Sequence, residues 1–103
     1  MSQIIKEEDR ILVIPGVDIV ASMANDFRTE LQNLIQENSG DIHLDLAGVE
    51  MVDSVGIGVI IATHNSLNRK GRKLKVVNVA KDIYSLFSTM RLDRHFSVEP
   101  LAS

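Results

Sequence analysis

Short β-branched segments alternate with longer amphipathic ones, and this alternation restricts the fold more than any other feature of the sequence. The strand-like segments are apolar and rich in Val and Ile, and they cover residues 10–14, 42–46 and 73–79. The helix-like segments carry apolar residues at helical spacing, and they cover residues 22–38, 53–68 and 80–90. Because a strand that returns through a helix pairs in parallel with the strand before it, the pattern predicts an α/β domain.

Two shorter segments extend this pattern at its ends. Ile4-Ile5-Lys6 is expected to pair with residues 10–14 across a turn, and Phe96-Ser97-Val98 to form a last short strand. The predicted order is ββαβαβα(β), with residues 42–46 central in the sheet. Ser22 is expected to cap the first helix, because its hydroxyl can accept a hydrogen bond from a free backbone N–H.

The apolar faces of the helices define the predicted core. The first helix contributes Met23, Phe27, Leu31, Leu34 and Ile35. The third helix contributes Ile83, Leu86, Phe87 and Met90. The second helix carries apolar residues throughout and ends at Gly71, after cations that suit a helix C-terminus. These cations, in residues 69–73, could also form a basic docking patch, but the helix end explains them better.

Composition excludes several classes of protein. The chain has 103 residues, the length of a single domain. Its net charge of −3 argues against nucleic acid as a main partner. The absence of cysteine excludes disulfides, thiolate metal sites and thiol catalysis. No secretory signal is visible at the start, and the longest apolar stretch, residues 55–62, is too short to cross a bilayer. We therefore expect a cytoplasmic protein without membrane insertion.

The sequence offers little for catalysis. The histidines stand apart, without metal-ligand spacing, at His43, His64 and His95. The serine-hydrolase elbow G-x-S-x-G is absent, since Val52 precedes Asp53-Ser54. Gly56-Ile57-Gly58 lacks the third glycine of a dinucleotide fingerprint, because Ile61 stands at that place. We predict a binding protein that is not an enzyme and needs no cofactor or metal.

The segment from Val52 to Gly58 is the remaining candidate site. A structural interpretation makes Asp53 a helix cap and the rest of the segment core. A functional interpretation notes that the Ser54 hydroxyl, on a loop entering a helix, is accessible to another protein's active site. Gly56 and Gly58 each weaken the helix by roughly 1 kcal/mol, and they leave room for a partner's backbone. Physical reasoning alone gives the two interpretations equal support.

Asp53-Ser54-Val55-Gly56-Ile57-Gly58 closely resembles the D-S-[ST]-G-[LI]-G signature of STAS domains, the family of anti-sigma-factor antagonists. The strand at residues 42–46, the Lys70-Gly71 turn and the Leu86-Phe87 helix also match, so the similarity covers essentially the whole chain. The resemblance implies a single STAS domain over residues 1–103, with a mixed sheet and helices packed mainly on one side.

The resemblance also implies a function, that of a partner-switching regulator. The unphosphorylated protein would bind an anti-sigma factor with serine kinase activity and so free the sigma factor. The kinase would phosphorylate Ser54 and the complex would dissociate, until a PP2C-type phosphatase resets the protein. ATP belongs to the kinase, and the antagonist itself is expected to be a monomer or weak dimer. The implied partner-binding residues are Asp53, Ser54, Val55, Gly56, Ile57 and Gly58, with Asp18 and Ser22.

Two positions depart from the family pattern. Val55 replaces the second Ser/Thr of the motif, which leaves Ser54 as its only hydroxyl. Many antagonists have G-x-[IL]-D before the first helix, whereas Val20 stands at that aspartate and Asp18 lies two residues earlier. The alternative is therefore a STAS subunit or scaffold of another assembly without a phospho-switch. Such an assembly could be a stress-sensing complex, a secretion regulator or a lipid-transport complex.

Overall fold

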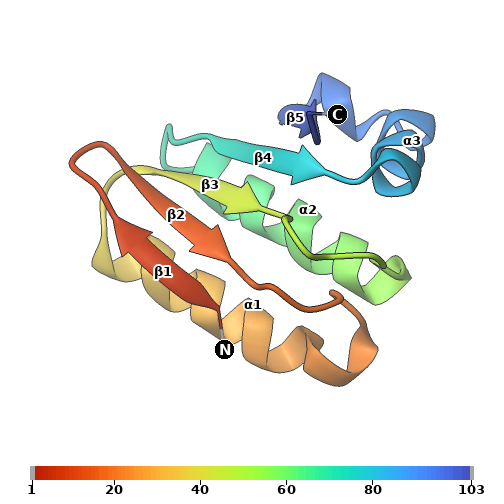
Figure 1. Cartoon of the computed structure of the whole chain (residues 1–103). Coiled ribbons are helices and arrows are strands. Elements are labelled where there is room, and N and C mark those ends of the chain that lie inside the picture. Colours follow the sequence, from red (N-terminus) through yellow and green to blue (C-terminus); the bar gives the residue numbers. More distant parts are fainter. Residues whose placement is uncertain (1, 103) are drawn as a thin grey trace.

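A five-stranded sheet runs through the computed structural model, which describes residues 2–102 (Figure 1). Its strands are β1 (Gln3–Lys6), β2 (Arg10–Ile14), β3 (Asp41–Asp45), β4 (Leu74–Val79) and β5 (Ser97–Pro100). They lie side by side in chain order, with β1 antiparallel to β2 and every other neighbouring pair parallel. The predicted mixed sheet, with the third strand at its centre, is confirmed.

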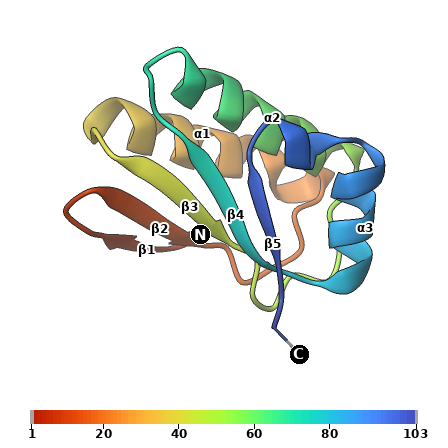
Figure 2. The ribbon, with the colours of Figure 1, turned by 90° about the horizontal axis from the view of Figure 1, so that it is seen from above.

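The two long helices cover the same face of this sheet (Figure 2). They are α1 (Ala21–Glu37) and α2 (Ser54–Asn68). A shorter helix, α3 (Lys81–Thr89), lies toward the β5 edge of the sheet. A single 3₁₀ turn, η1 (Leu92–Arg94), then leads into β5. Crossovers between parallel strands are almost always right-handed, so two that progress in one direction place their helices on one face. The predicted one-sided packing is confirmed.

The core lies between the sheet and these helices. Alternate strand residues point toward the helices because side chains along a strand alternate between faces. The sheet contributes the buried residues Ile11, Val13, Ile42, Leu44, Leu74 and Val76. The helices contribute the buried residues Phe27, Leu31, Ile35, Ile57, Ile60, Leu67 and Phe87.

Two predictions about the helices are wrong in detail. Ser22 does not cap α1, because the helix begins at Ala21 and the cap position belongs to Val20, whose side chain makes no capping hydrogen bond. In α3, Ile83 and Phe87 are buried, but Leu86 and Met90 are exposed. This short helix packs on β5 and η1 at the edge of the sheet, so only a narrow stripe of it is covered.

Candidate functional site

The motif lies where one loop enters α2, and this loop is joined to a second loop. One loop connects β2 to α1 and the other connects β3 to α2, and both follow the carboxyl ends of neighbouring parallel strands. Ile19 and Val52 form an isolated parallel bridge between the loops. The Ile19 N–H donates to the Met51 carbonyl at 3.0 Å, and the Asp53 N–H donates to the Ile19 carbonyl at 3.2 Å. These backbone hydrogen bonds therefore hold the start of the motif in place independently of its side chains.

The Asp53 carboxylate caps two helices at once. Its Oδ1 accepts from the Gly56 N–H at 2.8 Å, and its Oδ2 accepts from the Ala21 N–H at 3.0 Å. The hydrogen bond from Gly56, followed by that from Ala21, lowers the pKa of Asp53 below its usual value. Asp53 is thus an anion that ties the N-terminus of α1 to that of α2. The bond to Ala21 replaces the cap that was expected from Ser22.

Asp18 is engaged within its own chain. Its Oδ1 accepts from the backbone N–H of Glu50 at 2.9 Å and from that of Met51 at 3.1 Å. The half-buried carboxylate therefore holds the loop before the motif in place. Ser22 is exposed on the first turn of α1. Asp18 thus supports the loop that leads to the motif, and Ser22 directly follows Ala21, whose N–H bonds to Asp53.

The two motif glycines have different surroundings. A Cβ on Gly56 would overlap the backbone carbonyl oxygen of Ile19, so glycine is needed for α2 to approach that loop. A Cβ on Gly58 would have no other atom within 4 Å, and Gly58 is exposed. Gly56 and Ile57 are buried, so burial removes both from any surface that a partner could contact directly. Room for a partner's backbone exists at Gly58 and not at Gly56.

Ser54 is exposed as the first residue of α2, and exposed apolar side chains occur on the two joined loops and on this first turn. Val17 is 54% exposed, Met51 57% and Val55 42%, and all three lie on the joined loops or on the first turn of α2. We call Val17, Met51, Ser54, Val55 and Gly58 the Ser54 surface. Apolar side chains gathered around an accessible polar group are typical of a protein-docking site. Val17 and Met51 were not among the predicted site residues: Met51 directly precedes the motif in the sequence, whereas Val17 is joined to the motif loop only through contacts between distant segments.

The histidines gather elsewhere. His64 and His95 have ring centroids 6.3 Å apart and line a hollow of about 500 Å³ between α2 and the start of β5. Burial, followed by the charge of His95, lowers the pKa of His64. Among residues 2–102, no cluster of three His, Cys, Asp or Glu side chains could hold a metal ion. In the same part of the chain, no helix is both long and apolar enough to span a membrane.

Comparison with known proteins identifies the family. The family model of the STAS domain matches residues 3–102, so the chain belongs to the STAS domain family. The chain is 36% identical over 52 residues to the anti-sigma-B factor antagonist of Staphylococcus epidermidis. That alignment covers 50% of this chain and 48% of the relative, so it spans about half the length of the curated relatives it matches.

Solved structures agree on the fold. An anti-sigma factor antagonist from Mycobacterium paratuberculosis superposes with a TM-score of 0.85 at 19% identity, over 97% of this chain and 85% of that one. The anti-sigma factor antagonist SpoIIAA in its unphosphorylated form gives a TM-score of 0.73 at 10% identity, over 100% and 90% of the two chains. At these identities the likeness establishes a shared fold, and function has to be argued from the site.

Proposed function

We propose that this protein is an anti-sigma-factor antagonist that binds an anti-sigma factor with serine kinase activity through the Ser54 surface. The observation that carries the proposal is the exposed Ser54 at the start of α2, with exposed Val17, Met51 and Val55 on the two joined loops and the first turn of that helix. Similarity to the staphylococcal anti-sigma-B factor antagonist supports the class of partner. The protein acts by binding, and the chemistry is supplied by the kinase and by a PP2C-type phosphatase.

The switch is a phosphoryl transfer to Ser54. The kinase transfers the γ-phosphoryl group of ATP to the Ser54 Oγ, the hydroxyl proton passes to a base on the kinase, and ADP leaves. The phosphatase later hydrolyses the phosphoester and restores the hydroxyl. No cofactor is needed on this chain, because both catalytic sites belong to the partners.

Electrostatics explains why phosphorylation weakens the complex. The phosphate brings a charge of about −1.5 to −2 beside the Asp53 carboxylate. In the free protein, water and the N-terminus of α2 stabilise that charge. In the complex, the charge must be desolvated among Val17, Met51 and Val55, which offer it no hydrogen bonds. Affinity therefore falls while the domain stays folded.

Calorimetric titration against the candidate kinase, with and without ATP, tests the proposal. Ser54→Ala should bind like the wild type and lose its response to ATP, because the hydroxyl contributes at most about 0.5–1.5 kcal/mol. Ser54→Asp should bind roughly 5- to 150-fold more weakly. Ser39→Asp, which adds the same charge on the exposed loop between α1 and β3, is the matched control and should bind normally.

Two outcomes separate the proposal from its alternative. If Ser54→Asp binds as tightly as the wild type and the kinase leaves Ser54 unmodified, the phospho-switch is wrong. A STAS subunit of another assembly instead predicts that Ser54→Asp disturbs complex formation without any ATP-dependent modification. Melting curves of each variant must match the wild type, so that unfolding is not mistaken for loss of binding.

A further inference from the structure

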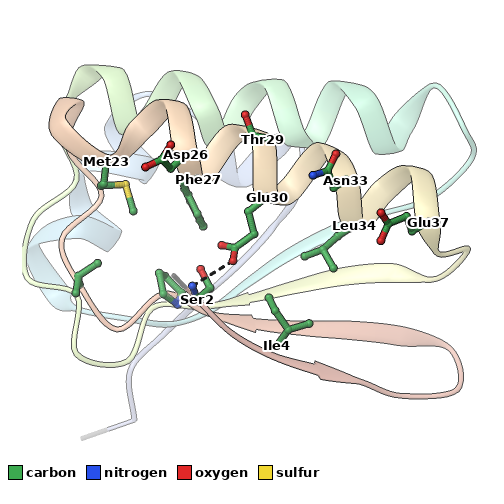
Figure 3. A pocket seen from close by; sticks show the side chains of 12 residues that line it. Ser2, Ile4, Met23, Asp26, Phe27, Thr29, Glu30, Asn33, Leu34 and Glu37 are labelled. Atoms are coloured by element: carbon green, nitrogen blue, oxygen red, sulfur yellow. Dashed lines mark hydrogen bonds between the residues drawn. The ribbon is translucent and has the colours of Figure 1, made fainter.

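An apolar groove of about 610 Å³ lies between α1 and the edge strand β1 (Figure 3). Its apolar wall is formed by Ile4 of β1 and by Met23, Phe27 and Leu34 of α1. Phe27 and Leu34 are buried core residues at the floor of the groove, whereas Ile4 and Met23 are half-buried and Val17 is exposed. These three supply the accessible apolar surface that a partner's apolar side chains can contact.

The rim of the groove is acidic. Asp26, Glu30 and Glu37 line it from α1, and Glu30 points toward Ser2 at the start of β1 (Figure 3). Among the described residues that line it, there are three carboxylates and no Lys, Arg or His. Glu30 Oε2 accepts from the Ser2 N–H at 3.2 Å, whereas Asp26 and Glu37 are exposed. The groove therefore favours an occupant that combines apolar and cationic side chains.

The sheet edge adds a second means of recognition. β1 is the outermost strand and pairs only with β2, so the backbone groups of its outer edge face away from the sheet. An extended segment placed there can form a sixth strand, and one row of its side chains then points toward α1. Backbone pairing and the acidic apolar groove would thus recognise the same segment.

The groove is continuous with the Ser54 surface. Val17 belongs to that surface and also lines the groove. The loop that carries Val17 is joined to the motif loop through the bridge between Ile19 and Val52. A partner that covers Ser54 and Val17 therefore already reaches the entrance of the groove.

We infer that the partner bound at the Ser54 surface also places an extended segment, with apolar and Lys or Arg side chains, in the groove beside β1. This inference rests on the proposed function. A second copy of the chain is a poor occupant, because pairing two β1 edges would bring two acidic rims together. The groove thus predicts that the partner carries an extended segment with basic and apolar side chains, separate from the kinase active site that contacts Ser54.

Charge reversal at the rim tests the electrostatic part. Asp26→Lys with Glu37→Lys should slow association with the kinase at least about tenfold and reduce its salt dependence, since rim charges act mainly on the association rate. Glu30 is left unchanged because it holds Ser2. Glu8→Lys with Asp93→Lys makes the same change in net charge at exposed residues outside the groove. This control should stay within about twofold of the wild type.

A photoreactive label identifies the occupant. The chain has no cysteine, so Asn33→Cys gives a single labelling site in the groove, and Asn65→Cys gives a control on the exposed side of α2. With the kinase bound, the label at residue 33 should crosslink to a peptide rich in Lys or Arg and apolar residues. Mass spectrometry reads that peptide directly.

The outcomes distinguish the inference from the function on which it rests. If the kinase binds and Ser54→Asp releases it, but the rim reversal binds like the wild type, the groove inference alone fails. A crosslink between two copies of the chain, or one to an acidic peptide, also overturns it. If the wild type binds no kinase at all, the proposed function fails and the inference falls with it.

Discussion

The two sides of the first turn of α2 have different surroundings. Asp53, Gly56 and Ile57 face the protein's own loops and core, whereas Ser54, Val55 and Gly58 face solvent. One short motif therefore combines a structural half, which fixes the loops, with an outer half that is available to a partner. The comparison shows that the structural interpretation holds for Asp53, Gly56 and Ile57, and it leaves Ser54, Val55 and Gly58 exposed for the proposed function.

The largest difference between the two sides is expected at the glycines. Gly56→Ala should destabilise the domain by about 2–3 kcal/mol, because the new Cβ meets the backbone of Ile19 and one of the two must shift. Gly58→Ala should instead stabilise it by about 0.5–1 kcal/mol, since its Cβ enters open space and alanine favours the helix. Urea unfolding of both variants measures this. Equal effects at the two positions would contradict the comparison.

A smaller effect, dependent on pH, is expected at Asp53. Its pKa in the folded protein lies below the ordinary value, so its hydrogen bonds stabilise the fold above the ordinary pKa of about 4. That contribution is lost as the pH falls through the folded pKa, when the carboxylate becomes protonated. Asp53→Asn should therefore be less stable than the wild type at pH 7, and the difference should shrink toward pH 3.

Unfolding midpoints across this pH range check the sign. Asp82→Asn is a useful comparison, because Asp82 also lies in the first turn of a helix, α3, but on an exposed surface. A difference between Asp53→Asn and wild type that stays constant from pH 7 to pH 3 would show that the two caps do not depend on the charge.

The smallest effect on stability is expected on the outer side, where binding should change most. Met51→Ser with Val55→Ser should leave the free energy of unfolding within about 0.5 kcal/mol of the wild type, because both residues are exposed and lie outside the core. The same double variant should bind the kinase roughly tenfold more weakly, since both belong to the Ser54 surface. Loss of stability without loss of affinity would reverse the assignment of the two sides.

Periodicity was sufficient to predict the strands and the three α-helices of this fold, but not the 3₁₀ turn η1. The strands were predicted from apolar residues at alternate positions, and the second helix from its boundaries at Asp53 and Gly71. The predicted ends agree with those in the structure to within one or two residues in most cases. The motif likewise placed Ser54 at the start of α2. These features depend on residues that are close together in the sequence, so the local sequence is sufficient to predict them.

Features that depend on contacts between distant segments could not be predicted in this way. The bond from Ala21 to Asp53, and the bonds from Glu50 and Met51 to Asp18, span 32 or 33 residues. Leu86 matches the apolar spacing of α3, but its exposure follows from the place of that helix at the sheet edge. The groove beside β1 is lined by residues of β1 and α1, two elements that no local spacing of residues brings together.

The joined loops also affect the entropy of recognition. A phosphoacceptor in a disordered segment has to be ordered when its kinase binds, at a cost of about 1–2 kcal/mol for each backbone residue fixed. Around Ser54 that ordering is completed when the domain folds, through the Ile19–Val52 bridge and the carboxylates of Asp18 and Asp53. Under the proposed function, a kinase would therefore meet a preorganised target, and its contacts would contribute to affinity without first immobilising the loop.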